Sequence, residues 1–389
     1  MVELAPFGVE AWLNKWEKKA RYDISQSTIA SLSMADLREL DDDPNTLDKL
    51  LFDAKLNYGL IEGSPAFKEA VAQLYEHVDP DQVLQTNGAT GANLAVLYAL
   101  VEPGDQVIAE YPSYQQLFDI PRSLGATVDY WRLREEEGWQ PRLAELANLV
   151  TEKTKLICLN NANNPTGTVL DRETLSRVAE IAREVGAYVL VDEVYHPLMK
   201  NGTACSIVDL YERGIATDSL SKTYSVPGLR IGWTVTNREV ADRLRSVRDY
   251  TMICGGVVND LLATYVLNHR HQVLARNRAL VEQNWALYQD WLAKEPLVSL
   301  VAPAGVSTSF PRLLIEEDTV SFCTRLLEQT GVLLVPGEAF ETPHHVRLGY
   351  CAPQPVLKEG LRRLSTFLHA ANCQTKCNGL SKNTSYGVS

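Results

Sequence analysis

Nearly all-apolar runs alternate with amphipathic runs through the middle of the chain. Residues 154–160 (TKLICLN) and 187–193 (AYVLVDE) carry few polar side chains, as expected of parallel strands buried on both faces of a sheet. Between them, residues 171–186 repeat apolar positions at helical spacing and end at a glycine, which predicts an amphipathic helix. Two further strands and a helix are expected at 82–86, 105–111 and 90–101. The alternation predicts an α/β domain with functional loops at the carboxyl ends of its strands.

The pattern changes after about residue 290, where short apolar runs follow one another closely. These runs occupy residues 297–303, 307–314, 332–337 and 344–350. With a helix expected from Asp318, they predict a smaller α+β domain. We therefore expect an N-terminal segment that joins the small domain and covers the active site, a large domain, the small domain and a polar, disordered tail. These parts are assigned to residues 1–45, 46–290, 291–370 and 371–389.

Composition narrows the classes of function. The chain has 389 residues, of which 45% are hydrophobic, and a formal net charge of −12, which argues against nucleic acid or an anionic membrane as the main partner. The N-terminus does not resemble a secretory signal, and no apolar run reaches the ~18 residues of a membrane span. Seven scattered cysteines, without a histidine or cysteine cluster, indicate free thiols and no metal site. We expect a cytoplasmic enzyme.

A glycine-rich turn, TNGATGANL from Thr86 to Leu94, lies between an expected strand and an expected helix. Free backbone N–H groups and the positive end of the helix dipole make such a turn an anion site. A dinucleotide site is one alternative, with Glu110 on the ribose, but the glycines fit G-x-G-x-x-G poorly and the chain has no Tyr-x-x-x-Lys pair. A plain structural turn is the other alternative.

Two more loops follow predicted strands. The first, NNANNPTG from Asn160 to Gly167, is either a surface turn or part of a ligand site at the strand ends. In the second, Asp192 ends an apolar strand, where an unpaired carboxylate is costly to bury. Asp192 therefore needs a cationic partner, either in a structural ion pair or in an active site.

Lys222 lies in the segment DSLSKTYSVPGLRIGW, between hydroxyl-bearing residues. Ser219 and Lys222 fit the S-x-x-K pattern of serine acyl enzymes, but the S-D-N and K-T-G elements of those enzymes do not occur in the chain. A structural lysine and a catalytic amine remain as alternatives for Lys222.

One ligand accounts for all these groups together. Pyridoxal phosphate requires a lysine for its Schiff base, an acid to keep its pyridine nitrogen protonated, and a helix N-terminus with hydroxyls and an arginine for its phosphate. The chain offers Lys222, Asp192, Ser219, Arg230 and the Gly88–Thr90 turn for these roles. The sequence thus predicts a pyridoxal phosphate site at one edge of the sheet.

With these motifs, residues 45 to 365 resemble the aminotransferase class I/II family of fold-type I pyridoxal-phosphate-dependent enzymes. The resemblance implies a large domain with a mainly parallel seven-stranded sheet flanked by helices, plus a smaller α+β domain. It implies that Lys222 forms the Schiff base and carries the proton, and that Asp192 pairs with the pyridinium. Asn164 and Tyr195 match the two donors to the phenolic oxygen of the cofactor.

The same resemblance assigns the remaining contacts of the cofactor and substrate. The residues implied around the phosphate and the pyridine ring are Gly88, Ala89, Thr90, Ser219, Arg230 and Tyr114. Arg347 and Asn164 match substrate-binding residues, and Arg347 would clamp the α-carboxylate. Tyr58 matches a tyrosine that reaches the cofactor of a neighbouring subunit, which implies a homodimer.

The N-terminal segment departs from the common pattern of this family. The usual Gly-containing cover, of the form L-x-x-G-x-P, is replaced by YDISQSTIASLSM. This segment, with EAWLNKW before it and LRELDDD after it, is similar to capreomycidine synthase, a family branch that eliminates and cyclises. Asp23 in this cover is a candidate for binding a cationic substrate side chain, or alternatively caps a turn.

These observations leave three functions open. The first is an aminotransferase that uses an α-amino acid and a 2-oxo acid. The second is a lyase or cyclase of specialised metabolism, because the motifs do not encode where the electrons of the substrate carbanion go. The third is a non-catalytic pyridoxal-phosphate-binding sensor, although only about 45 residues precede the Tyr58 segment and the chain is acidic.

Overall fold

The computed structural model describes residues 4–198 and 205–382, which form two compact units. The large unit consists mainly of Thr28–Ala279 and Pro303–Val306. The small unit consists of Pro6–Ser27, Leu280–Ala302 and the chain from Ser307. Compared with the predicted parts, the small unit takes only the first half of the N-terminal segment and begins earlier within the long helix that precedes residue 291. The predicted domain boundaries stay a prediction.

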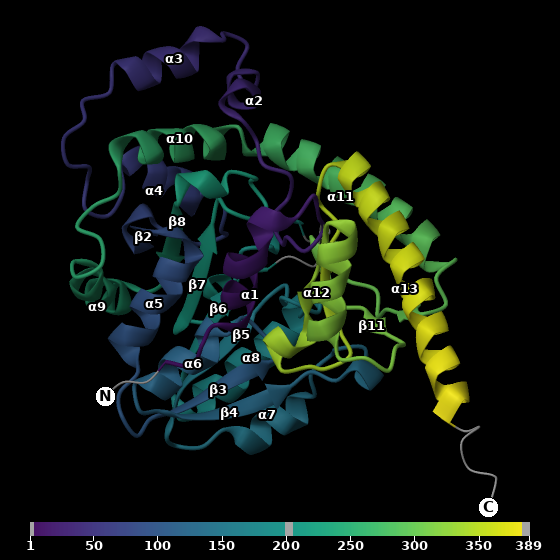
Figure 1. The fold of residues 1–389 in the computed structure, drawn as a ribbon. Helices are drawn as coiled ribbons and strands as arrows, with labels where there is room; N and C mark the ends of the chain where they lie inside the picture. The colour runs from purple at the N-terminus through teal and green to yellow at the C-terminus, as the bar shows by residue number, and fades with distance from the viewer. Residues whose placement is uncertain (1–3, 199–204, 383–389) are drawn as a thin grey trace, which may run out of the picture. The chain divides into compact units, whose positions relative to one another are not determined.

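A seven-stranded sheet forms the centre of the large unit, with the strand order β2-β8-β7-β6-β5-β3-β4 (Figure 1). Only β8 runs antiparallel to its neighbours, so the sheet is mainly parallel, as expected. The strands are β2 (Val83–Thr86), β3 (Gln106–Tyr111), β4 (Thr127–Arg132), β5 (Thr154–Asn160), β6 (Tyr188–Asp192), β7 (Gly214–Ser219) and β8 (Gly232–Val235).

Both faces of this sheet are buried, which explains the apolar runs of its sequence. Along β6, Val189 and Val191 pack into one hydrophobic cluster, whereas Leu190 packs into another. Since successive side chains of a strand point to opposite faces, the two clusters lie on opposite sides of the sheet. The prediction of doubly buried strands is confirmed.

Helices surround the sheet of the large unit. α8 begins after Asp171, whose carboxylate caps the Thr174 N–H, and ends at Gly186 with a φ of 72°, a left-handed conformation that glycine adopts without strain. The α-helices assigned to this unit alone are α2 (Met34–Arg38), α3 (Asn45–Phe52), α4 (Pro65–Ala72), α5 (Gly88–Leu100), α6 (Gln116–Ser123), α7 (Leu143–Leu149), α8 (Arg172–Val185), α9 (Arg238–Arg248) and α10 (Val257–Asn268). The boundary between the units falls within α11 (Arg270–Leu292).

Strand register brings several chain segments to one edge of the sheet. Asn160 at the end of β5 lies beside Asp192 at the end of β6, and Asp192 lies beside Thr217 of β7. Gly232 at the start of β8 pairs with Thr86 at the end of β2 and with Ser219 at the end of β7. The loops after β2, β5, β6 and β7 therefore leave the sheet at the same edge.

The small unit contains short strands and three helices besides the part of α11 that it shares. Its helices are α1 (Gly8–Trp16), α12 (Thr319–Thr330) and α13 (Gln354–Lys382). Its strands are β1 (Tyr22–Asp23), β9 (Val298–Ser299), β10 (Thr308–Ser309), β11 (Arg312–Leu313), β12 (Val332–Leu333), β13 (Val335–Pro336) and β14 (Val346–Gly349). β1 pairs in parallel with β12, which ties the N-terminal segment to this unit.

The C-terminal end differs from the sequence prediction. A disordered tail was expected from residue 371, but α13 continues through the polar residues to Lys382. Residues 383–389 lie outside the described residues. Within the described part of the chain, no helix is both long enough and apolar enough to cross a membrane. The five cysteines whose side chains are described are free thiols.

Candidate active site

Asp192 ends β6 at the loop edge of the sheet and is buried, with 4% of its surface exposed. Its Oδ2 accepts a hydrogen bond of 2.8 Å from the Asn93 side chain, and its Oδ1 accepts one of 3.3 Å from the Val194 N–H. Asn93 is in turn fixed by the Thr217 hydroxyl, which donates to its Oδ1 at 2.7 Å. The carboxylate is therefore held in one orientation by α5 and by the turn after β6, and β7 fixes Asn93 through Thr217.

Two opposing influences set the pKa of Asp192. Burial raises this pKa to about 6, since a charged carboxylate is poorly solvated inside the protein. The hydrogen bonds from Asn93 and Val194 and the positive charge of Lys222 each lower it. Lys222 follows the end of β7, the strand next to β6, and its positive charge is therefore one of the influences on this carboxylate. A second cation beside Asp192 would stabilise its ionised form further.

An anion-binding cradle lies beside Lys222. The Arg230 Nη1 donates to the Ser221 hydroxyl at 3.3 Å. A Cβ atom added to Gly88 would come within 2.8 Å of the Arg230 Nη2, so the guanidinium lies against the first turn of α5 and would have to shift for a larger residue. Gly88 has a φ of 68°, which also favours glycine. Within the described part of the chain, Arg230 makes no ion pair with a carboxylate.

This arrangement fits pyridoxal phosphate. The cradle combines an exposed guanidinium, a helix N-terminus and a serine hydroxyl, which together match a phosphate dianion. The buried carboxylate of Asp192 matches a protonated pyridine nitrogen, and Lys222 supplies the amine. The fit rests on the chemistry of these groups and on the space that Gly88 leaves.

The loop from Asn160 to Gly167 is also part of this edge, rather than a surface turn. The Asn164 N–H donates to the Asn160 Oδ1 at 2.8 Å, and both residues are buried. Glu110 of β3 accepts hydrogen bonds from the Asn160 N–H and the Asn163 side chain. Because Glu110 is buried and holds this loop, it is not placed to bind a ribose, and the dinucleotide alternative fails on this point.

The aromatic candidates lie on the same side of the large unit. Tyr195 is buried three residues after Asp192 and packs with Ala162 and Val306. Tyr114 follows β3 and packs partly buried against the core.

Glu193, the residue after Asp192, accepts hydrogen bonds from Ser206 and Ile207, and burial raises its pKa to about 8.

Three predicted site residues lie elsewhere. Tyr58, between α3 and α4, is 83% exposed. Arg347 in β14 of the small unit is buried, and its Nε donates to the Ser25 carbonyl at 3.1 Å. Asp23, in β1 of the same unit, accepts hydrogen bonds from the Ser25 N–H and hydroxyl and from Gln26. These contacts match the turn-capping alternative for Asp23, and its role in substrate binding stays a prediction.

Sequence reasoning missed three contacts at this site. Asn93 was overlooked, although a polar residue at a buried position of an apolar helix is an informative signal. Ser221 is the hydroxyl bonded to Arg230, whereas Ser219 accepts the Ser221 N–H at 3.3 Å. The Thr28 hydroxyl lies 3.5 Å from the Lys222 Nζ. No sequence signal marked this contact because the two residues are 194 positions apart in the chain.

Comparison with known proteins shows the family of this chain. The family described as Aminotransferase class I and II matches residues 37–364. The crystal structure of a PLP-dependent aminotransferase from Streptococcus suis 89-1591 is 54% identical in sequence, with a TM-score of 0.92, and the match covers 95% of this chain and 99% of that chain.

Two further relatives carry out a different type of reaction according to their names. Capreomycidine synthase from Streptomyces vinaceus is 29% identical over 366 residues, which cover 92% of this chain and 93% of the relative. The structure of the PLP-dependent cyclase OrfR has a TM-score of 0.87 and 28% identity, covering 95% of this chain and 98% of that chain. The chain belongs to the aminotransferase class I and II family of fold-type I pyridoxal-phosphate-dependent enzymes.

Proposed function

We propose that this protein is a pyridoxal-phosphate-dependent aminotransferase that acts on an α-amino acid through a Schiff base at Lys222. The observation that carries the proposal is geometric: Asp192 ends β6, and Lys222 follows the end of the neighbouring strand β7 by three residues, with Arg230 against the start of α5. A structural lysine would not need a fixed carboxylate, an anion cradle and an amide-rich loop at the same sheet edge.

When bound, pyridoxal phosphate supplies an aldehyde for Lys222 and a ring that delocalises the electron pair left at the substrate α-carbon. Asp192 keeps the ring nitrogen protonated, since its carboxylate is fixed by Asn93 and cannot be solvated by water. The Lys222 Nζ would accept the proton that leaves the substrate α-carbon and hold it for the later protonation step. The Thr28 hydroxyl near the Nζ is placed to hold that amine once it is free.

The remaining contacts follow from the family. The phosphate would be held by Arg230, Ser219 and the Gly88–Thr90 turn, and Tyr114 would lie against the ring. Asn164 and Tyr195 would donate to the phenolic oxygen. Ser221, which accepts a hydrogen bond from Arg230, would support the phosphate site. Arg347 binds the α-carboxylate of the amino acid and, in the second half-reaction, of a 2-oxo acid.

We also propose a homodimer. The exposed Tyr58 is accompanied by large apolar side chains with at least half of their surface exposed. These residues are Phe52, Leu56, Leu60, Ile61, Tyr250 and Ile253. The two segments that carry them are neighbours, because a Cβ on Gly59 would lie 2.6 Å from the Gly255 carbonyl oxygen. Such a patch is typical of a protein interface, and a second copy would bring Tyr58 to its partner's phosphate. The cytoplasmic location stays a prediction.

A lyase or cyclase is the second candidate function. It is favoured by the N-terminal cover, whose Thr28 contacts Lys222 where the common family pattern has a glycine-containing stretch. The two candidates share the abstraction of the α-proton by Lys222. They differ in whether the electrons return to the cofactor carbon or expel a group from the β-carbon of the substrate.

A spectrophotometric screen of amino acids, with and without 2-oxoglutarate, distinguishes the candidates. An aminotransferase forms a new keto acid only when the acceptor is present, and consumes both substrates in equal amounts. A lyase or cyclase turns over without an acceptor and only with an amino acid that carries a β-leaving group. Absence of turnover with every amino acid would favour the sensor.

A further inference from the structure

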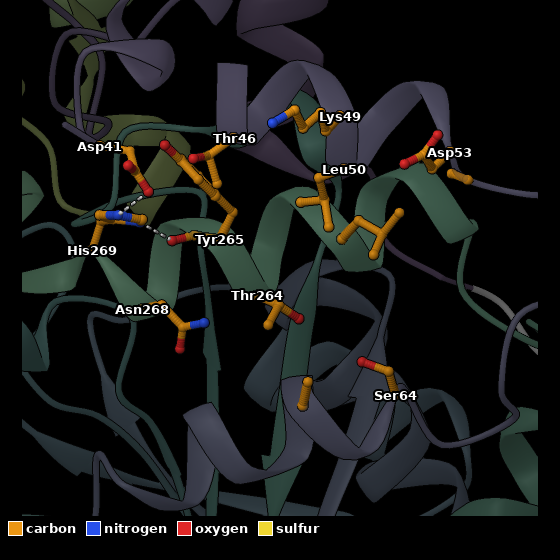
Figure 2. A pocket seen from close by; sticks show the side chains of 13 residues that line it. Asp41, Thr46, Lys49, Leu50, Asp53, Ser64, Thr264, Tyr265, Asn268 and His269 are labelled. Carbon is orange, nitrogen blue, oxygen red and sulfur yellow. Dashed lines mark hydrogen bonds and ion pairs between the residues drawn. The ribbon is translucent and has the colours of Figure 1, made fainter. Parts of the chain in front are cut away.

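A pocket of ≈ 800 Å³ lies in the large unit, between α3 on one side and α10 and the start of α4 on the other (Figure 2). None of the residues proposed to hold the cofactor lines it. A volume of this size is typical of small-molecule sites.

One end of the pocket is polar. Figure 2 shows Asp41, Thr46, Tyr265 and His269 grouped there, with the Lys49 amine directed toward Thr46. The Nε2 of His269 lies 3.7 Å from the Asp41 Oδ2, and its Nδ1–H donates to the Tyr265 carbonyl. Lys49 makes no ion pair within the described ranges 4–198 and 205–382. A free cation and a carboxylate thus lie at the same end.

The hydroxyl of Tyr265 is the unusual group of this pocket. Tyr265 is only 5% exposed, and no described residue is a hydrogen-bond partner of its hydroxyl. Buried polar atoms in native proteins nearly always have a partner. Burial and then the charge of Asp41 raise the pKa of Tyr265, so the hydroxyl keeps its proton and can donate. The Thr264 hydroxyl on the pocket wall is also without a partner in the part of the chain that the structure describes.

Most of the exposed surface of the lining is apolar, although Ser64, Thr264 and Asn268 add polar groups. Leu50 of α3 and Leu261 of α10 face the pocket, together with Ala54 and Ala66. Asp53 is exposed and lies at the far end of α3, where water solvates it. A ligand would therefore find opposite charges and a phenol at one end and an apolar surface beyond them.

We propose that this pocket binds a free α-amino acid with an apolar side chain, at a site separate from the proposed active site. The carboxylate of the ligand accepts from the Tyr265 hydroxyl and pairs with the Lys49 ammonium. The ligand ammonium donates to the Asp41 carboxylate and the Thr46 hydroxyl. The side chain packs against Leu50 and Leu261. This inference does not depend on the proposed function.

Protection of Lys49 from acetylation tests the proposal directly. The purified full-length protein is treated with an acetylating reagent at increasing concentrations of L-leucine, and each lysine is followed by peptide mass mapping. Leucine should slow labelling of Lys49 severalfold relative to Lys153, an exposed lysine remote from the pocket lining, whose rate corrects for the reagent that the leucine amine consumes. 3-Methylbutylamine, without a carboxylate, and 4-methylpentanoate, without an amine, should protect far less.

The variant Tyr265→Phe removes only the donor. It should raise the leucine concentration needed for protection about tenfold, as expected for a lost hydrogen bond to a charged group. The matched control Tyr98→Phe, at an exposed position of α5, should behave as the wild type. Lack of protection at Lys49 in the wild type would overturn the proposal. So would an unchanged midpoint in Tyr265→Phe, since protection would then come from leucine bound elsewhere.

Discussion

The loop edge of the large sheet and the segment around Tyr58 differ in how many of their side chains are paired or buried within one chain. At the sheet edge, Asp192 has partners from α5 and its own turn, and Glu110 ties the Asn160 loop to β3. Around Tyr58, large apolar side chains are exposed instead. The electrostatic part of the site is therefore organised within one chain, whereas its completion is expected to need a second copy.

Removal of the Lys222 amine should have the largest effect on the site at the sheet edge. Lys222→Ala should abolish turnover, because no other group is expected to take the α-proton. The protein should keep its fold, which circular dichroism checks, and should lose the visible absorption band of the linkage between cofactor and lysine. Turnover within tenfold of the wild type would contradict the assignment of Lys222.

Asp192→Ala should lower kcat by ~10²-fold or more, as expected for the loss of a preorganised electrostatic partner. Cofactor affinity should fall far less, since the phosphate cradle around Arg230 is untouched. Steady-state kinetics with saturating cofactor, together with a cofactor titration, separate the two effects. If turnover stayed within a few-fold of the wild type, Asp192 would be no more than a structural ion-pair residue.

Tyr58→Phe tests whether the exposed segment around Tyr58 completes the site of a second copy. If the Tyr58 hydroxyl reaches the partner's phosphate, its removal should weaken cofactor binding about tenfold, the effect of one hydrogen bond to a charged group. Tyr98→Phe, also at an exposed position, is the control. Sedimentation should show a dimer for all three proteins. A monomeric wild type, or equal cofactor affinity in both variants, would mean that the exposed segment has another use.

Glu110→Gln tests, through the pH dependence of the unfolding free energy, whether Glu110 at the sheet edge is buried and protonated. Burial raises the pKa of Glu110 to about 7, so the folded protein keeps a proton that the unfolded chain releases near pH 4.5. This stabilisation is complete below pH 4.5 and is lost as the pH rises through 7. Between pH 4.5 and 7.5 the wild type should lose about 3 kcal/mol of unfolding free energy relative to Glu110→Gln, measured by urea unfolding. Parallel pH profiles would contradict a buried, neutral Glu110.

The sequence predicted the parts of the fold whose signal is local. β5 and β6 were expected at 154–160 and 187–193, because strands buried on both faces are apolar throughout. β4, β7 and β8 were not assigned, since polar residues such as Asp129, Asp218 and Thr234 interrupt their apolar pattern. Their place in the sheet follows from pairing between distant segments, which a single sequence does not show.

The candidate site was predictable to the extent that its groups follow strands. Asp192 was a candidate because an unpaired carboxylate at the end of an apolar strand is costly to bury. Asn164 was named through the resemblance of its loop to the family. The support given by Asn93, Ser221 and Thr28 depends on three-dimensional contacts made by common residue types. The continuation of α13 to Lys382 was missed because its polar composition favours disorder as much as an exposed helix.

The proposed function requires that Lys222 is the lysine that carries the cofactor. Borohydride reduction of the purified yellow holoenzyme, followed by digestion and peptide mass mapping, identifies that lysine directly. We expect the reduced pyridoxyl group on Lys222, in the peptide that contains Ser219 and Ser221, with no label on Lys49 or Lys200. A pyridoxyl group on any other lysine, or a protein that binds no cofactor at all, would contradict the account.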